Sequence, residues 1–184
     1  MTRVRRLAPL PLWLALVLSA AAGLIGVTAF APLSIWVSAF ISLFLLWWCL
    51  DRRSFWTGLL VGLVYGLTLW APLINWLTVY LGPIPWLALA VTEALYIAIA
   101  SGLIALIFGF SRSRGMKTRW LHVITPAAVA ALWVVHEWLA ANWPWGGFSW
   151  ARFGMAQYEG LFAHSLSWIG SAGLSFVIAW TCAA

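Results

Sequence analysis

Apolar residues fill most of the chain in six long runs, separated by short segments that are polar or rich in turn-forming residues. A helix needs about 20 apolar residues to cross the hydrocarbon core of a bilayer, and each run is close to that length. The pattern therefore predicts an all-α fold, a polytopic bundle that forms one transmembrane domain over residues 1–184. The predicted spans are about Leu7–Phe30, Leu33–Leu50, Phe55–Leu81, Ile84–Phe110, Trp120–Ala141 and Leu161–Ala184.

Basic residues are distributed unevenly between the two faces that these spans define. If the connecting segments alternate between faces, only Arg152 among the ten Lys and Arg residues falls on the second face. The other nine are Arg3, Arg5, Arg6, Arg52, Arg53, Arg112, Arg114, Lys117 and Arg119. Lys and Arg in short loops are retained in the cytoplasm. The N-terminus is therefore predicted to be cytoplasmic and the loop Asn142–Gly160 external, in a multi-pass protein of the cytoplasmic membrane.

Composition supports a membrane location. The chain is 65% hydrophobic and 8% charged, whereas a soluble domain carries about 25% charged residues. The net charge of +6 comes from short juxtamembrane clusters, which suit anionic lipid headgroups better than nucleic acid. The basic N-terminus followed by an apolar run resembles a secretory signal, but that run continues to Phe30 and further spans follow, so a first transmembrane helix is favoured.

Small residues in the third run indicate close helix packing. Gly58, Gly62 and Gly66 are spaced by four, which places them on one helix face where another backbone can approach. Pro72 lies near the outer end of the same run and is expected to kink the helix there.

Two of the four acidic residues, Glu93 and Glu137, lie inside predicted spans. An ionisable residue within a membrane is a candidate for function, although a structural hydrogen bond between helices is the alternative for both. Asn75 and His136 fall at a similar depth. Together these four residues predict a polar recess that opens to the outside.

A complete active site is not apparent in the sequence. His136-Glu137 begins a zinc-protease motif, but Ala140 stands where the second histidine belongs. Cys49 and Cys182 have no activating partner nearby in sequence. No catalytic residue, metal or other cofactor is therefore assigned.

Tryptophan is abundant, with 16 residues in the chain. Those predicted near the outer boundary are Trp76, Trp86, Trp138, Trp143, Trp145 and Trp150. An interfacial aromatic belt accounts for part of this group. The concentration within Asn142–Trp150 equally suits a surface that holds lipid chains.

The stretch from Ala131 to Phe176 resembles the membrane region of bacterial apolipoprotein N-acyltransferases. The residues that carry the resemblance are Ala131-Leu132-Trp133, His136-Glu137-Trp138-Leu139, Trp143-Pro144-Trp145-Gly146-Gly147-Phe148, Phe153-Gly154, Gln157, and Gly170 with Gly173-Leu174-Ser175-Phe176. The earlier Phe30-Ala31-Pro32 and Ile74-Asn75-Trp76 segments also match the family, so the similarity extends over nearly the whole chain.

The resemblance implies an enzyme that transfers a fatty acyl chain from a membrane phospholipid to the N-terminal amine of an apolipoprotein. In that family the chemistry belongs to an external nitrilase-like domain with a Glu-Lys-Cys set. No counterpart of that set is found here, so the chain is expected to be a fragment, a truncated gene product or half of a split pair, and inactive alone. A separate nitrilase-like domain is then a partner. The expected substrate-binding residues are Asn75, Glu93, His136, Glu137, Trp143, Trp145 and Gln157.

A non-enzymatic membrane protein, either half of a small transporter or an assembly scaffold, is the alternative function. A transporter is expected to carry polar groups through both halves of the bilayer. The polar residues here gather in the outer half, which favours the acyltransferase interpretation.

The predicted orientation can be tested by cysteine labelling in intact cells. A membrane-impermeant thiol reagent is expected to modify a cysteine placed at Gly147 and to leave one placed at Gly115 unmodified. The unsubstituted protein controls for Cys49 and Cys182. The reverse labelling pattern would overturn both the orientation and the acyltransferase interpretation.

Overall fold

The computed structural model describes residues 10–113, 118–144 and 146–184, except for the side chains of residues 118–121. The described part is helical and contains no strand, which confirms the all-α prediction. Its helices are α1 (Leu12–Val27), α2 (Val37–Leu50), α3 (Phe55–Leu73), α4 (Leu77–Leu81), α5 (Pro83–Ser113), α6 (Thr118–Asn142) and α7 (Leu166–Ala183), with the 3₁₀ helices η1 (Met155–Gln157) and η2 (Ala163–Ser165) before α7.

Four helical segments within the described residues are long and apolar enough to cross a membrane: Phe55–Leu73, Pro83–Ser113, His122–Asn142 and Ala163–Ala183. Helices α1 and α2 are apolar but shorter, with 16 and 14 residues. The chain is thus a membrane protein with helices at all six predicted positions. Only four of these helices reach the length that the sequence pattern indicated.

The predicted third span, Phe55–Leu81, is wrong at its C-terminal end. Helix α3 starts at a capping box, in which the Ser54 hydroxyl accepts the Thr57 N–H and Thr57 Oγ1 accepts the Ser54 N–H. The helix ends at Leu73, one residue after Pro72. The chain leaves helical geometry at Ile74, whose N–H still donates to the Trp70 carbonyl, and re-forms a short helix, α4.

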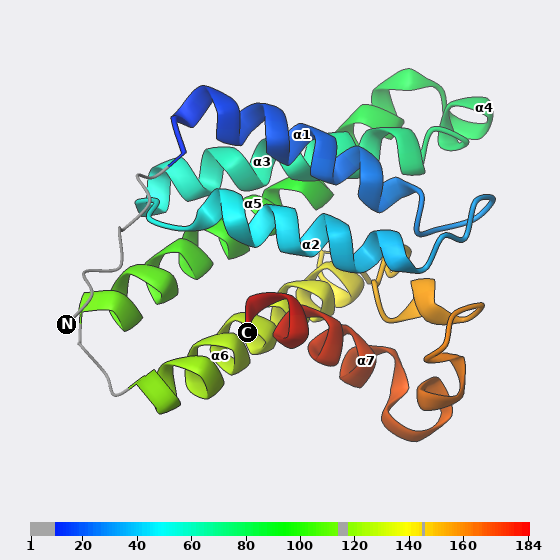
Figure 1. Ribbon diagram of the computed structural model, residues 1–184. Coiled ribbons are helices and arrows are strands. Elements are labelled where there is room, and N and C mark those ends of the chain that lie inside the picture. The colour runs from blue at the N-terminus through cyan, green and yellow to red at the C-terminus, as the bar shows by residue number, and fades with distance from the viewer. Residues whose placement is uncertain (1–9, 114–117, 145) are drawn as a thin grey trace.

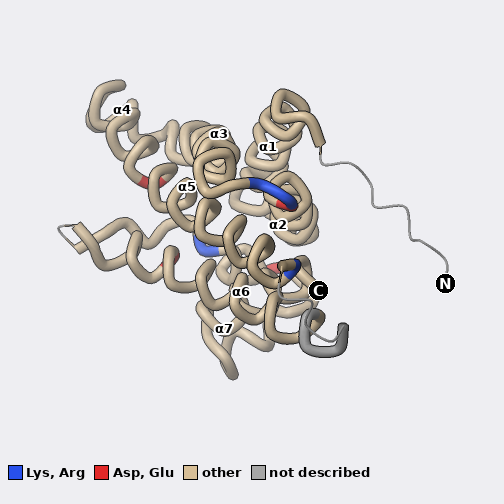
Figure 2. The backbone as a smooth tube through the Cα atoms, turned by 90° about the vertical axis from the view of Figure 1, so that its left-hand side faces the viewer, with Lys and Arg blue, Asp and Glu red and all other residues tan. Residues whose placement is uncertain are grey.

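The bundle has one end that carries the basic segments and one that carries the long loop. Helices α1, α2, α3 and α5 run side by side in Figure 1, with α6 and α7 below them; the loop with η1 and η2 lies at the same end as α4. At the opposite end Arg112 pairs with Asp51, and Arg53 donates to the carbonyls of Cys49 and Leu10. Away from that end, the charged residues of the described chain are Glu93, Glu137, Arg152 and Glu159, so long stretches of the helices carry no charge (Figure 2).

Helices α3 and α5 pack with almost no side chain between them. A Cβ atom added to Gly66 would lie 2.7 Å from the Ala94 Cα, and one added to Gly62 would lie 3.0 Å from the Ala98 Cα. Gly58 faces Ala105 in the same way. The three glycines therefore form a helix interface, as their spacing predicts.

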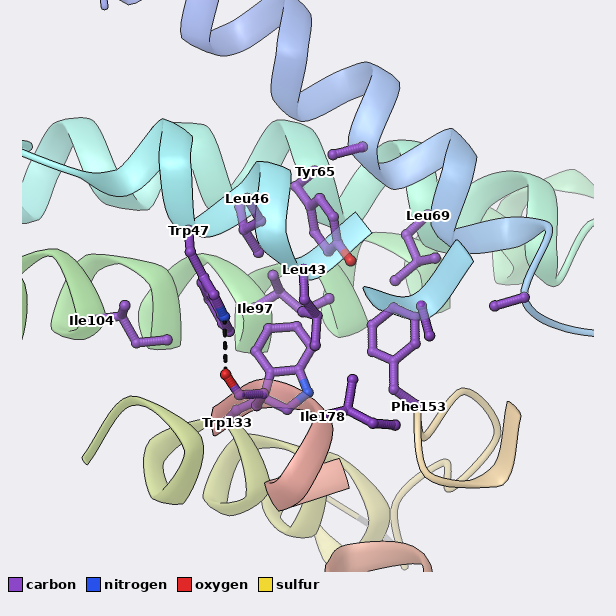
Figure 3. Close-up of a cluster of buried hydrophobic side chains, with 14 of the residues drawn as sticks. Leu43, Leu46, Trp47, Tyr65, Leu69, Ile97, Ile104, Trp133, Phe153 and Ile178 are labelled. Carbon is purple, nitrogen blue, oxygen red and sulfur yellow. Dashed lines mark hydrogen bonds between the residues drawn. The ribbon is translucent and has the colours of Figure 1, made fainter. Parts of the chain in front are cut away.

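The hydrophobic core lies where α2, α3, α5, α6 and α7 converge. Figure 3 shows Trp47 and Trp133 facing each other across this core, with the Trp47 Nε1–H donating to the Ala179 carbonyl at 3.3 Å. Phe153 reaches the same core from the long loop and is fully buried. The loop is therefore packed into the bundle as well as lying across its end. The labelled core residues are Leu43, Leu46, Trp47, Tyr65, Leu69, Ile97, Ile104, Trp133, Phe153 and Ile178.

The structure refines the positions for cysteine labelling. Gly147 has a φ of +69° and its Cβ would overlap the backbone at Ala141, so a cysteine there is strained. Gly115 lies outside the described residues. Exposed Glu159 and Ser113 are better positions for the loop and for the opposite end.

The α3–α5 contact generates a stability prediction. Replacing Gly62 with Leu should separate the two backbones and lower the free energy of unfolding by about 1–3 kcal/mol, as overpacking typically does. Thermal unfolding in detergent measures the loss. Gly109→Leu on α5 is the matched control, because a Cβ at Gly109 meets nothing within 4 Å. Equal losses in both variants would contradict the packing role.

Candidate functional site

Glu137 joins the long loop to helix α6. The carboxylate is 7% exposed. Its Oε1 accepts the Nε1–H of Trp133, one turn earlier on α6, at 3.1 Å. The same oxygen accepts the backbone N–H of Phe153 in the loop at 3.3 Å. One side chain therefore satisfies a buried indole and a buried loop amide.

Further hydrogen bonds attach the loop to three helices. The Gly154 N–H donates to the buried Ser175 Oγ of α7 at 2.8 Å, and the Phe148 N–H donates to the Ala140 carbonyl of α6 at 2.7 Å. Gln157, fully buried in η1, donates its Nε2–H to the Trp36 carbonyl next to α2 at 3.2 Å. The loop thus has a defined position against α2, α6 and α7.

Three of the four residues of the predicted polar recess meet. Glu93 of α5, His136 and Glu137 of α6 and Arg152 of the loop line one cavity of about 20 Å³. The remaining walls are mostly apolar and include Leu69, Trp70, Ile97, Trp133, Phe148 and Phe153. A cavity of this size holds about one water molecule. We call it the polar cavity; it is too small for an acyl chain.

The other predicted site residues lie elsewhere. Asn75 is exposed in the turn between α3 and α4 and does not line the polar cavity, because α3 ends at Leu73. Trp143 is 65% exposed, and its carbonyl accepts the hydroxyl of Tyr96. Trp145 lies outside the described residues. Gln157 contacts α2 and is likewise absent from the cavity lining.

A larger hollow lies beside the loop. It has a volume of about 260 Å³ and lies between the α1–α2 turn, the end of α3 and the loop. The Trp76 and Trp150 rings are 5.4 Å apart, between their centroids. We call this the aromatic hollow. Its lining residues are Phe30, Ala31, Leu73, Trp76, Trp150, Met155, Ala156 and Tyr158.

Arg152 is the residue whose position the sequence did not indicate. The distribution of Lys and Arg predicts only that Arg152 belongs to an external loop. In the structure it lines the polar cavity, and its Nε atom is buried. The Trp133–Glu137 spacing of one helical turn could have predicted their hydrogen bond. No local pattern could have placed Arg152 beside them.

The attachment of the loop to α7 can be tested by stability. Ser175→Ala removes the only acceptor found for the Gly154 N–H among the described residues. Leaving a buried donor unpaired costs about 1–3 kcal/mol, which thermal unfolding in detergent should detect. Ser167→Ala, also on α7, is the control, because Ser167 is exposed and its hydroxyl donates to the nearby His164 carbonyl. A Ser175 variant as stable as this control would mean that the loop does not need that bond.

Comparisons with known proteins identify the family of the chain. A family model described as "Apolipoprotein N-acyltransferase N-terminal domain" matches residues 22–184. The chain is 27% identical over 163 residues to an apolipoprotein N-acyltransferase of Pasteurella multocida, a match that covers 88% of this chain and 30% of that protein. A 70-residue stretch is 39% identical to an apolipoprotein N-acyltransferase of Mycolicibacterium smegmatis and covers 37% of this chain and 12% of that protein. The chain therefore spans less than a third of the length of these relatives, and it belongs to the apolipoprotein N-acyltransferase family through the N-terminal domain of that family.

Proposed function

We propose that this chain is the membrane domain of an enzyme that transfers a fatty acyl chain from phospholipid to the N-terminal amine of diacylglyceryl-cysteine lipoproteins. Membership of the family supports the reaction class. The main support for a lipid-binding role of this domain is the aromatic hollow, which lies at the same end of the apolar bundle as the long loop. In the predicted orientation that end faces outward.

The aromatic hollow, and not the polar cavity, is the proposed contact for lipid. Its volume of about 260 Å³ exceeds the roughly 20 Å³ around Glu137 by more than tenfold. Tryptophan and tyrosine combine an apolar ring with a polar edge, which suits the boundary between acyl chain and headgroup. Glu137 then acts on substrate indirectly, by holding the loop that contributes Trp150.

The reacting nucleophile is proposed to come from a nitrilase-like partner domain. A thiol or hydroxyl needs an activating partner to react at neutral pH. The two cysteines, Cys49 near the end of α2 and Cys182 near the end of α7, lie far along their helices from the loop, and Cys182 donates to the Phe40 carbonyl. This chain is therefore expected to bind lipid without transferring it, and apolipoprotein is the acceptor of the assembled enzyme.

A chimera tests this function. Residues 22–184 would replace the matching segment of the Pasteurella multocida relative, and the purified protein would be mixed with phospholipid and a diacylated lipopeptide. A mass gain of one fatty acyl group on the peptide is expected. Trp76→Ala should lower the rate about tenfold, equivalent to about 1.4 kcal/mol of transition-state stabilisation, because it removes one wall of the aromatic hollow and does not touch the lining of the polar cavity.

The controls separate lipid contact from general damage. Trp168→Ala removes an aromatic side chain that is 88% exposed and lies outside the hollow, and it should leave the rate near that of the unsubstituted chimera. This chain alone should give no mass gain. A folded chimera without activity would contradict the proposed function, and equal rates in the two tryptophan variants would contradict the role of the hollow.

A further inference from the structure

The polar cavity contains buried polar atoms that have no hydrogen-bond partner. They are Glu137 Oε2, His136 Nδ1 and Arg152 Nε. All three residues line the cavity, together with Glu93, which is 3% exposed. Buried polar atoms are nearly always hydrogen-bonded in folded proteins. Several unpaired atoms around one small space therefore indicate a shared ligand.

Arg152 and Glu137 attract each other but are not in direct contact. A guanidinium and a carboxylate carry opposite charges, and both residues line this cavity. The ion pairs formed by the described side chains, however, join Asp51 to Arg52 and to Arg112. A buried charge is strongly unfavourable unless it is paired and hydrogen-bonded. The gap between the two groups needs a mediator that accepts from one and donates to the other.

The size of the cavity limits what this mediator can be. About 20 Å³ accommodates one water molecule, and a buried water needs two to four polar partners. The apolar walls and the presence of both charge signs disfavour an anion or a larger cation. Water can accept from the Arg152 Nε–H and donate to Glu137 Oε2, and His136 and Glu93 offer further partners.

We propose that the polar cavity binds one water molecule that bridges Arg152 to Glu137, and that this water-mediated ion pair sets the position of the long loop. Glu137 serves the loop through both oxygens: Oε1 accepts the Phe153 N–H directly, and Oε2 reaches the neighbouring Arg152 through water. Arg152 is then a positioning residue. It holds the segment that carries Trp150 and Tyr158 to the aromatic hollow. The inference concerns the position of the loop and holds independently of acyl transfer.

Hydrogen exchange of the loop amides tests the coupling. In the full chain in detergent, Arg152→Met and Glu137→Gln should each speed exchange at Phe153 and Gly154 about tenfold, because each leaves the other charge uncompensated. If the two charges are coupled, exchange in the double variant should be slower than the rate obtained by multiplying the two single-variant increases. Arg152→Lys should restore part of the protection, since it keeps the charge. Glu159→Gln, an exposed acid of the same loop, is the control and should exchange as the unsubstituted protein does.

Two kinds of result would overturn the proposal. One lies in the exchange data: either the Phe153 and Gly154 amides of Arg152→Met are as well protected as those of the control, or the two single effects simply multiply in the double variant. The other comes from a high-resolution structure of the unsubstituted protein, which does not depend on any variant folding. Density for one water within hydrogen-bond distance of Arg152 Nε and Glu137 Oε2 is expected there. A dry cavity, or a direct contact between guanidinium and carboxylate, would exclude the water bridge.

Discussion

A non-helical segment buried in an apolar bundle must find a partner for each of its backbone N–H groups, because hydrocarbon offers none. The segment around Phe153 meets this requirement with two side chains from different helices, Glu137 of α6 and Ser175 of α7. The position of the loop, the closure of the polar cavity and the shape of the aromatic hollow all follow from these bonds. A buried carboxylate is unfavourable in this setting, and its retention is explained by the amide and the indole that it satisfies.

The helices can supply these groups because their backbones are held close together. Glycines on α3 face Ala94, Ala98 and Ala105 of α5, so the two helices approach with little between them. Association in a membrane depends on such van der Waals contact, because lipid removes the hydrophobic driving force between helices. The α3–α5 contact brings Leu69 and Trp70 of α3 and Glu93 of α5 to the same cavity.

The helices and part of the site could be predicted from the sequence because both depend on local spacing. Apolar runs located the helices, and the four-residue spacing of glycines located an interface. Glu93, His136 and Glu137 were expected to share one recess, and they do line one cavity. The prediction was possible because ionisable residues buried at the same depth of a membrane usually face one another. Asn75 was misplaced because the third apolar run was expected to be helical as far as Leu81, whereas α3 ends at Leu73. Arg152 was missed because its environment is created by a loop that folds back, and neither hydropathy nor charge count contains that information.

The unequal lengths of the helices affect the lipid around the protein. At about 1.5 Å per residue, α1 and α2 extend roughly 24 and 21 Å, whereas α5, with 31 residues, extends roughly 46 Å. A hydrocarbon core is about 30 Å thick, and a bilayer thins around elements that are too short. The turn between the two short helices contributes Phe30 and Ala31 to the aromatic hollow. The thinnest bilayer is therefore expected at that edge of the bundle, next to the aromatic hollow.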